Sequence, residues 1–298
     1  MFKKVLIIGC GLIGSSILRA IDNKKLAKNI LVFEKSKKNI YKIKKIKKKL
    51  KFINTIDNQI SDVDFVVICT PMSEYKKIVG KLNKNLNSNC LITDVGSTKM
   101  NTIKLKNKFL NKKLNWISSH PIAGSEVSGP EHGNRNLFLN KWCVIIKEKK
   151  QNKKKISILK RFWKKIGANV VLMDSIKHDQ VFSITSHLPH LIAYNLIKTA
   201  QDSQKKQKKN LIQYSAGGLR DFSRIAASNE IMWRDIFFSN ENIIKAIDLF
   251  SKNLSLFKKI IKNKNNKKLL SKLISTKRVR KQIVDLKQDI NKPDFGRE

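Results

Sequence analysis

Lys4-Val-Leu-Ile-Ile-Gly-Cys-Gly-Leu-Ile-Gly14 begins as an apolar strand and runs directly into a Gly-x-Gly-x-x-Gly turn. Apolar residues at helical spacing follow the turn, and a second apolar run, Ile30–Phe33, ends in Glu34. A strand, a glycine-rich turn, a helix and a second strand that ends in an acid form the β-α-β unit that binds dinucleotides. The stretch therefore predicts an α/β N-terminal domain with a dinucleotide site.

Each glycine of the turn has a physical purpose in such a site. Gly9 permits the tight turn, Gly11 lets the backbone approach a pyrophosphate, and Gly14 allows the helix to pack closely on the strand. The phosphates then lie at the N-terminus of the helix, beside Leu12 and Ile13. We expect these five residues to bind the cofactor.

The acid at the end of the second strand bears on the choice of cofactor. Glu34 can accept hydrogen bonds from a ribose 2′-hydroxyl and repels a 2′-phosphate, which favours NAD over NADP. Lys35–Lys38 follow at once and include three lysines. These cations can shelter a phosphate if Glu34 turns away, so NADP stays open.

Five further apolar runs predict strands, at Phe65–Cys69, Cys90–Thr93, Trp116–Ser118, Cys143–Ile146 and Val170–Met173. The first three have polar or catalytic residue types at their carboxyl ends, namely Thr70-Pro71, Asp94-Val-Gly-Ser-Thr-Lys99 and His120-Pro-Ile-Ala-Gly124. Ligands of open parallel sheets bind outside the carboxyl ends of the strands. We therefore expect Thr70, Pro71, Asp94 and Ser97 to lie at the cofactor.

The pattern changes around Asp174–Gln180, and no further run reads as a strand. Ser186–His190 is expected to lead into a helix, and the Lys/Gln-rich Gln201–Lys209 to form a polar loop. Two heptad-like apolar stripes follow, at Ile243, Ile247, Phe250, Leu254, Phe257, Ile261 and at Val279, Ile283, Leu286, Ile290. Such stripes can pack internally or against a second copy of the chain, and we favour a homodimer. The residues after Ile290 are expected to form a frayed tail.

The charge is strongly positive, since 63 Lys and Arg residues outnumber 22 Asp and Glu and give a net charge of +41. Only nine of the cations are arginines, and the lysines travel with Asn and Ile between the motifs. Nucleic-acid binders mix arginine and aromatic residues into the basic surface. We therefore interpret the excess as a bias in surface composition, and expect no specific nucleic-acid partner. The longest apolar runs fall well short of the roughly 20 residues of a membrane span.

The four cysteines show no CxxC pairing and no clustering with histidine. Three lie in or beside apolar runs, which favours buried reduced thiols over disulfides or metal ligands. We expect no metal and a reducing cytoplasm. Gly9–Gly11 interrupts the first apolar run and no small-residue cleavage site follows it, so we interpret this run as a mature strand rather than a signal peptide.

Five motifs in this order are similar to those of the prephenate/arogenate (cyclohexadienyl) dehydrogenases of tyrosine biosynthesis. They are Gly9–Ser16, Asp94–Lys99, His120–Gly129, Ser186–His190, and Gly217–Ala226 with Met232–Asp235. The resemblance covers nearly the whole chain. It implies a Rossmann-type domain followed by an all-α dimerisation domain, and NAD(P)-dependent oxidative decarboxylation of prephenate or arogenate. The alternative is a related Rossmann reductase that acts on an imine or a β-hydroxy acid.

The resemblance implies that His120 is the catalytic base and that Ser97 orients it. A base for this reaction should titrate near neutrality and lie beside the nicotinamide. A hydroxyl can fix a histidine tautomer. Ser97 can also be a plain N-cap of a helix that begins at Thr98.

The substrate is a small dianion, and arginine binds carboxylates with two parallel hydrogen bonds. The resemblance assigns Arg224 to the ring carboxylate, while Arg220 is expected to set the local field. Asp221 and Glu126 resemble family acids that gate the site, with structural salt bridges as the alternative. Trp233 is expected to cover the pocket or to pack in the core.

The motif Ser186-His-Leu-Pro-His190 resembles the part of the family site that binds substrate. His190 is the better candidate, because its spacing of four from Ser186 puts both on one helical face. His187 is the second candidate. A helix-capping role is the alternative for either histidine.

We expect a dinucleotide-binding domain at residues 1–175 and a helical substrate-binding and dimerisation domain at residues 176–298. No segment resembles the fused chorismate mutase or the C-terminal regulatory domain of some relatives. We therefore expect any feedback by tyrosine to act at the active site or at the dimer interface.

Overall fold

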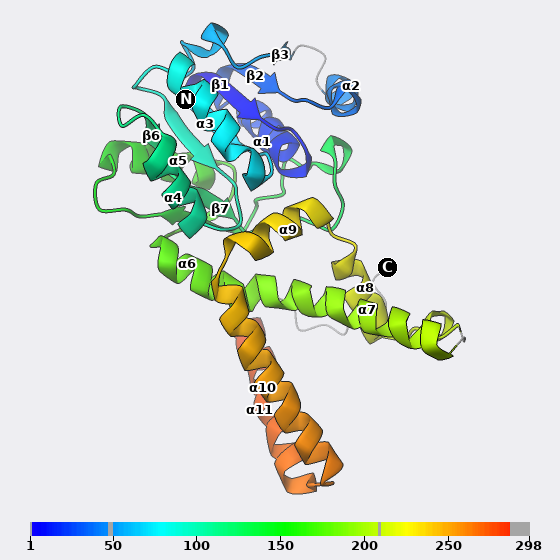
Figure 1. The fold of residues 1–298 in the computed structure, drawn as a ribbon. Coiled ribbons are helices and arrows are strands. Elements are labelled where there is room, and N and C mark those ends of the chain that lie inside the picture. The colour runs from blue at the N-terminus through cyan, green and yellow to red at the C-terminus, as the bar shows by residue number, and fades with distance from the viewer. Residues whose placement is uncertain (1, 47–49, 208–209, 287–298) are drawn as a thin grey trace.

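A computed structural model describes residues 2–46, 50–207 and 210–286. The N-terminal part holds two β-sheets with flanking helices, and a long series of helices follows (Figure 1). This arrangement confirms the predicted fold class, a Rossmann-type α/β domain followed by a helical C-terminal domain.

The larger sheet has six parallel strands in the order β3-β2-β1-β4-β5-β6. Its strands are β1 (Phe2–Ile8), β2 (Ala27–Phe33), β3 (Lys51–Ile53), β4 (Phe65–Ile68), β5 (Leu91–Asp94) and β6 (Asn115–Trp116). In the register of the sheet, Ile8 pairs with both Phe33 and Ile68, and Ile68 pairs with Asp94. Four strands therefore end side by side, and the loops that follow them share one edge of the sheet. The sequence patterns missed the short β3.

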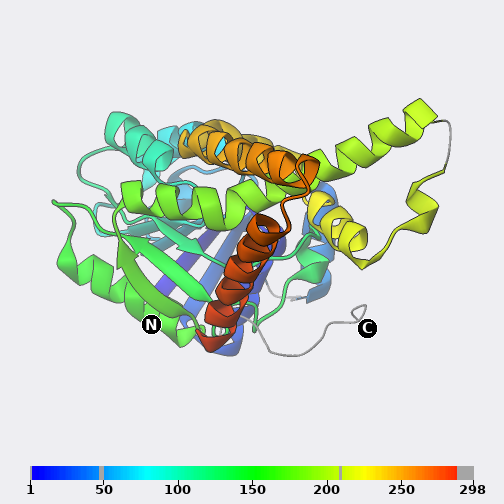
Figure 2. The same ribbon diagram turned by 90° about the horizontal axis from the view of Figure 1, so that it is seen from below.

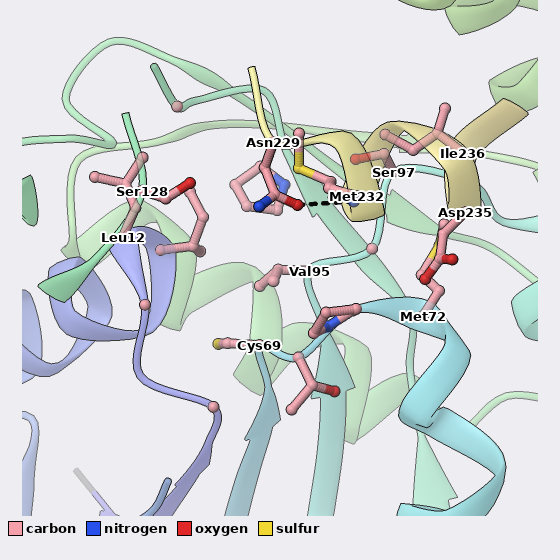
Figure 3. Close-up of a pocket in the computed structure, with 18 of the residues that line it drawn as sticks. Leu12, Cys69, Met72, Val95, Ser97, Ser128, Asn229, Met232, Asp235 and Ile236 are labelled. Carbon is pink, nitrogen blue, oxygen red and sulfur yellow. Dashed lines mark hydrogen bonds between the residues drawn. The ribbon is translucent and has the colours of Figure 1, made fainter. Parts of the chain in front are cut away.

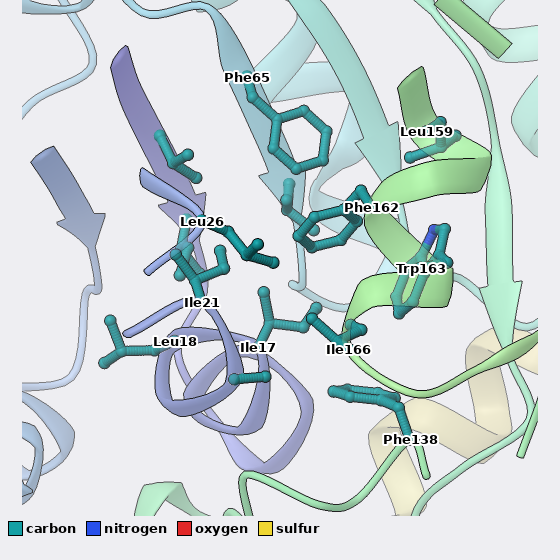
Figure 4. Packing of buried hydrophobic residues seen from close by; sticks show 14 of the residues in the cluster. Ile17, Leu18, Ile21, Leu26, Phe65, Phe138, Leu159, Phe162, Trp163 and Ile166 are labelled. Atoms are coloured by element: carbon teal, nitrogen blue, oxygen red, sulfur yellow. The ribbon is translucent and has the colours of Figure 1, made fainter. Parts of the chain in front are cut away.

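Five helices accompany these strands: α1 (Leu12–Asn23), α2 (Lys37–Ile46), α3 (Tyr75–Asn85), α4 (Met100–Phe109) and α5 (Lys153–Lys165). Side chains of β1 alternate between two apolar clusters, so that Val5 lies in one and Leu6 in the other. In the first cluster, Phe162 of α5 packs against Phe65, and Trp163 packs against Phe162 (Figure 4). The sheet is thus buried on both faces, which holds its loop-bearing edge rigid.

The second sheet corrects one predicted strand. It has the order β7-β8-β9, from Ser119–Pro121, Trp142–Ile146 and Asn169–Met173, and β7 runs antiparallel to β8. We predicted one strand over Trp116–Ser118, with His120 in the loop behind it. Instead Ile117 N donates to Ile92 O in the first sheet, and Ser118 O accepts from Ile146 N in the second. The chain therefore crosses between sheets, and His120 lies within β7.

The helical part begins directly after β9 and holds no strand among the described residues between 174 and 286. Its helices are α6 (Ser175–Phe182), α7 (Leu188–Gln207), α8 (Gly217–Ala226), α9 (Glu230–Ser239), α10 (Asn242–Lys262) and α11 (Asn266–Asp285). Short 3-10 turns lie at Asn58–Ile60, Met72–Glu74, Pro130–His132 and Ile212–Tyr214. A π-helical turn, Ser183–His187, joins α6 to α7, so that helix runs without a break from Ser175 to Gln207.

One prediction for this region was wrong, and a second was confirmed with a difference in what precedes the helix. The polar loop predicted at Gln201–Lys209 is helical as far as Gln207, because Lys and Gln favour helices even where no apolar stripe marks one. Residues 208–209 lie outside the described residues. Ser186–His190 leads into a helix as predicted, since α7 begins at Leu188, but α6 and the π turn precede α7 without a break. Pro189, which lacks an N–H, is accommodated where this turn interrupts the regular ladder.

The two apolar stripes lie on α10 and α11, which form a hairpin that projects away from the sheet (Figures 1 and 2). Ile243 at the base of α10 is buried, but Leu254 is 58% exposed and Val279 is 52% exposed. Within the single chain Leu254, Ile261 and the described residues of the second stripe are therefore exposed, and the rest of the first stripe is half-buried or buried. Ile290 and the predicted tail lie outside the described residues. Over residues 2–46, 50–207 and 210–286, no helix is long and apolar enough to cross a membrane.

Candidate active site

A cavity of about 1030 Å³ lies at the shared strand-end edge of the large sheet, between this edge and the helical part. Figure 3 shows Asn229 and Met232 of the α9 region opposite Val95 and Cys69 at the strand ends. Many of the predicted site residues line the cavity: Gly9, Gly11, Leu12, Ile13, Glu34, Thr70, Pro71, Ser97, His120, Glu126, Ser186, His190, Arg224 and Trp233. The fold thus brings together side chains that come from both parts of the chain.

Five predicted residues do not line this cavity. Gly14 lies behind the turn, where an added Cβ would come within 2.2 Å of Gly9 O. Asp94 is fully buried beneath the strand ends, and His187 is buried with its Nδ1 3.0 Å from Asn240 Nδ2. Arg220 and Asp221 are exposed on α8.

The glycine-rich turn fits a pyrophosphate. Gly9 has a φ of +83°, in the region that favours glycine, and an added Cβ would lie within 2.9 Å of Cys69 O. At Gly11 an added Cβ would meet nothing within 4 Å, so the backbone faces open space there. The first turn of α1 begins beside it, and the N–H groups of a first helical turn have no intrahelical acceptor. Thr70 Oγ1, which has no hydrogen-bond partner among the described residues, lies in the same wall.

Glu34 faces the turn and is held by two backbone groups. Its Oε2 accepts from Cys10 N at 2.8 Å, and its Oε1 accepts from Ser36 N at 2.9 Å. Lys35, the first of the neighbouring cations, forms an ion pair with Glu74. The carboxylate is therefore directed into the cavity rather than away from it, and each oxygen keeps a lone pair for a ligand hydroxyl.

His120 presents one ring nitrogen to the cavity. It is 8% exposed, and its Nδ1 lies 2.9 Å from Nε2 of His178, which leaves His120 Nε2 for a ligand. Burial, followed by the nearby charges of His178 and Lys99, lowers the pKa of His120 well below the usual histidine value. The imidazole is therefore neutral at pH 7 and has a lone pair for a proton, although its pKa lies below the near-neutral value expected of the base from the sequence.

Ser97 lines the cavity, but the hydrogen bonds of the described residues include none between Ser97 and His120. The helix after it also begins later than predicted, at Met100. The N–H groups of Lys99 and Met100 both donate to the carboxylate of Asp179, each at 2.8 Å. The helix terminus is thus capped from another helix.

The far wall of the cavity combines a cation with aromatic rings. Arg224 Nη1 donates to Glu126 Oε2 at 3.4 Å, and the buried Nε of Arg224 has no hydrogen-bond partner among the described residues. The His190 ring stacks on Trp233 at a centroid distance of 3.8 Å, and its Nδ1 lies 3.0 Å from Ser186 O. Burial lowers the pKa of His190, so this end of the cavity offers one guanidinium beside neutral rings.

Sequence patterns missed three buried residues around the site. His178 and Asp179 lie behind His120, and Asp235 accepts from Ser73 N at 3.1 Å, linking α9 to the loop after β4. Their signal is slight: His178 and Asp179 are adjacent polar residues that become buried near the start of a helix. Only the tertiary contact with His120 distinguishes the pair from surface residues.

Two family descriptions match the chain in succession. "Prephenate dehydrogenase, nucleotide-binding domain" matches residues 17–172, and "Prephenate dehydrogenase, dimerization domain" matches residues 174–275. Together they span most of the sequence, and they meet where the strands give way to helices.

Individual proteins agree with these matches. The cyclohexadienyl dehydrogenase of Zymomonas mobilis is 32% identical over 80% of this chain and 82% of its own length. The prephenate dehydrogenase of Bacillus subtilis is 30% identical over 82% of this chain and 66% of its own length. A crystal structure of A. aeolicus prephenate dehydrogenase, in complex with hydroxyphenyl propionate and NAD+, superimposes with a TM-score of 0.86. The two chains are 33% identical, and the match covers 95% of this chain and 99% of that one. The chain therefore belongs to the prephenate dehydrogenase family.

Proposed function

We propose that the protein catalyses the NAD-dependent oxidative decarboxylation of prephenate in tyrosine biosynthesis. The observation that carries the proposal is the place of His120. This buried, neutral base lines one cavity with a dinucleotide-binding turn and with Arg224. The names of its relatives, and the NAD+ and hydroxyphenyl propionate bound to the A. aeolicus enzyme, support the same conclusion.

The glycine-rich turn, the first turn of α1 and Glu34 hold the cofactor. When bound, NAD supplies the acceptor for the hydride that leaves the alcohol carbon of the substrate. Glu34, fixed by Cys10 N and Ser36 N, receives the ribose hydroxyl and disfavours a 2′-phosphate. NAD is therefore the preferred cofactor, with NADP a weaker one.

His120 takes the proton of the ring hydroxyl at Nε2 as the alcohol carbon is oxidised. The ring carboxylate para to this carbon leaves as carbon dioxide, because its loss makes the ring aromatic. Arg224 holds the ring carboxylate of the substrate, and its unpartnered Nε gives it capacity for a ligand beyond Glu126. Ser186, His190 and Trp233 enclose the ring.

The remaining predicted residues have indirect roles in this proposal. Ser97 orients the nicotinamide and the ring hydroxyl from the loop after β5, and Asp94 shapes this loop from below. His187 supports the helix junction next to Ser186. Arg220 and Asp221, exposed on α8, set the field at the cavity entrance.

The protein acts as a homodimer through its C-terminal helices. The exposed side chains of Leu254 and Ile261 on α10 and the dimerization-domain description of residues 174–275 support this proposal. Sedimentation of Leu254→Glu should yield monomer where the wild type sediments as a dimer, and Lys252→Glu on the same helix should stay dimeric. A wild-type monomer would contradict it.

We also propose that the boundary between the two domains lies between residues 175 and 176, and that the protein acts in the cytoplasm.

A two-by-two assay of prephenate or arogenate with NAD or NADP tests the proposed activity. Reduced nicotinamide is followed by its absorbance, and the aromatic product is identified by chromatography. We expect the highest kcat/KM with prephenate and NAD. Absence of turnover with both substrates would contradict the proposal, and faster turnover of arogenate would reassign the substrate.

A further inference from the structure

We propose that His178 and Asp179 are positioning residues for His120. They hold one tautomer of its ring, with the proton on Nδ1 and the lone pair of Nε2 directed at the substrate. The inference rests on the proposed role of His120 as the base. It assigns a task to two buried polar residues outside the cavity wall.

The three side chains form a continuous hydrogen-bonded chain. His120 Nδ1 lies 2.9 Å from His178 Nε2, and His178 Nδ1 lies 2.7 Å from Asp179 Oδ1. His178 and Asp179 are 0% exposed, and His120 is 8% exposed. The chain therefore runs from the protein interior to the cavity, with only its last ring reaching a ligand.

The direction of each hydrogen bond follows from Asp179, the acid at the buried end of the chain of three side chains. An ionised carboxylate only accepts, so His178 Nδ1 must carry the proton that it shares with Asp179. His178 Nε2 in the neutral ring is then an acceptor, and His120 Nδ1 must donate to it. The proton of neutral His120 thus lies on Nδ1, which leaves Nε2 free to accept the proton of the substrate hydroxyl.

Asp179 is fixed in its accepting state by two backbone donors. Lys99 N donates to Oδ1 and Met100 N donates to Oδ2, each at 2.8 Å, and these groups form the N-terminus of α4. The positive end of a helix stabilises a carboxylate. Asn240 Nδ2 donates to the backbone carbonyl of Asp179 at 2.8 Å, which holds α6 in register. Both the charge and the place of the acid are therefore set before substrate binds.

An aromatic ring shields the chain from water. The Phe182 ring lies 5.0 Å from the His120 ring and 4.5 Å from the His178 ring, measured between centroids. Fixed dipoles act more strongly in such a dry setting than in water. The imidazolium that forms when His120 takes a proton keeps its Nδ1–H donation to His178, with the charge of Asp179 one ring further on.

A purely structural role for His178 and Asp179 would lead to different results when His178 is replaced. Asp179 caps α4 whether or not His178 is present, so a structural role concerns stability and not the tautomer of His120. Replacing His178 distinguishes a structural role from a positioning role. Leu removes the acceptor for His120 Nδ1–H. Gln offers an amide whose NH2 faces the accepting Asp179 and whose oxygen then faces His120.

The test reads the tautomer directly. In protein labelled with 15N-histidine, long-range 1H–15N correlations show which ring nitrogen carries the proton, and each of the five histidines is assigned with a single variant. We expect Nδ1–H for both His120 and His178 in the wild type without substrate. Nε2–H on His120 would overturn the inference. Because no substrate is present, a failure of the proposed activity would not mimic this result.

Kinetics complete the test. In His178→Leu we expect His120 to shift toward the Nε2–H tautomer and kcat to fall by about tenfold or more, with the KM for NAD unchanged. His178→Gln should keep Nδ1–H on His120 and recover most of kcat. His132→Gln, an exposed site outside the cavity, is the matched control and should keep the wild-type kcat. Equal losses in the Leu and Gln variants, with the tautomer of His120 unchanged, would overturn the inference.

Discussion

Lys99 Nζ lies 2.6 Å from Asp94 Oδ2, and neither side chain is exposed at all. The ammonium also donates to Ser119 O at 2.7 Å and to Ser118 Oγ at 3.1 Å, so each of its three protons has an acceptor. Burial of two charges is costly unless such additional hydrogen bonds satisfy them. The pair joins the loop after β5 to the backbone next to His120, so it holds together two strand ends that form the site.

Removal of this ammonium should therefore destabilise the fold. In Lys99→Met the carboxylate of Asp94 stays buried without its cation, which costs about 3–5 kcal/mol in the free energy of unfolding. Urea denaturation measures the loss. Lys104→Met, on the exposed face of α4 where Lys104 pairs with Glu241 at the surface, should lose under about 1 kcal/mol. Similar losses in the free energy of unfolding of the two variants would show that the buried pair of Lys99 and Asp94 stabilises the fold no more than a surface ion pair.

The carboxylate of Glu34 should set the preference for NAD. Glu34→Gln keeps one oxygen, which can accept from the N–H group of either Cys10 or Ser36, and removes the charge that repels a 2′-phosphate. We expect the ratio of kcat/KM for NADP to that for NAD to rise by about tenfold, which corresponds to about 1.4 kcal/mol. Lys28→Gln, which removes an exposed cation near the start of β2 and outside the cavity lining, is the control. An unchanged ratio in Glu34→Gln would assign cofactor choice elsewhere.

Arg224 should act mainly on substrate binding. A hydrogen bond to a charged group contributes about 1.5–3 kcal/mol, so Arg224→Gln should raise the KM for prephenate roughly 10- to 150-fold. Initial-rate kinetics give this value. Arg161→Gln, on the exposed side of α5, is a matched loss of one guanidinium and should leave the KM as it is. An unchanged KM in Arg224→Gln would favour a reductase whose substrate lacks this carboxylate.

The sequence was sufficient for features that are local along the chain. The turn at Gly9–Gly14 and the strand before it are encoded in consecutive residues, so their structure follows from steric rules and apolar runs. The helical end of α7 at Gln201–Gln207 was missed because this largely exposed segment has no apolar stripe, although most of its residues have good helix propensity.

Contacts between distant segments lay beyond such patterns. His120 and His178 are 58 residues apart, and Lys99 and Asp179 are 80 apart. The sequence motif at Asp94–Lys99 marked the region as functional but did not indicate that Lys99 is a buried cation. The crossing from β6 to β7 also depends on hydrogen bonds with two different sheets. Only the tertiary fold brings these groups within bonding distance.

Buried histidines should make the protein less stable in weak acid. Burial lowers the pKa of His187 from 6.5 to about 4, so below pH 6.5 the unfolded chain binds a proton that the folded chain does not. The free energy of unfolding is therefore unaffected by His187 above pH 6.5 and falls as the pH is lowered. At pH 5 this loss is about 2 kcal/mol. Urea titrations at pH 7 and pH 5 measure the difference. In His187→Gln the difference in the free energy of unfolding between pH 7 and pH 5 should be smaller by this amount. An unchanged difference in that variant would show that His187 does not cause the pH dependence.

The turnover of prephenate with NAD by His120→Asn, measured beside the wild type, tests the central claim most directly. An amide cannot take the hydroxyl proton at neutral pH, and loss of a general base lowers the rate by roughly 10²- to 10⁴-fold. We predict a fall in kcat of this size, with the Kd for NAD unchanged because the glycine-rich turn and Glu34 are intact. Turnover near the wild-type rate would contradict the assignment of His120 as the catalytic base.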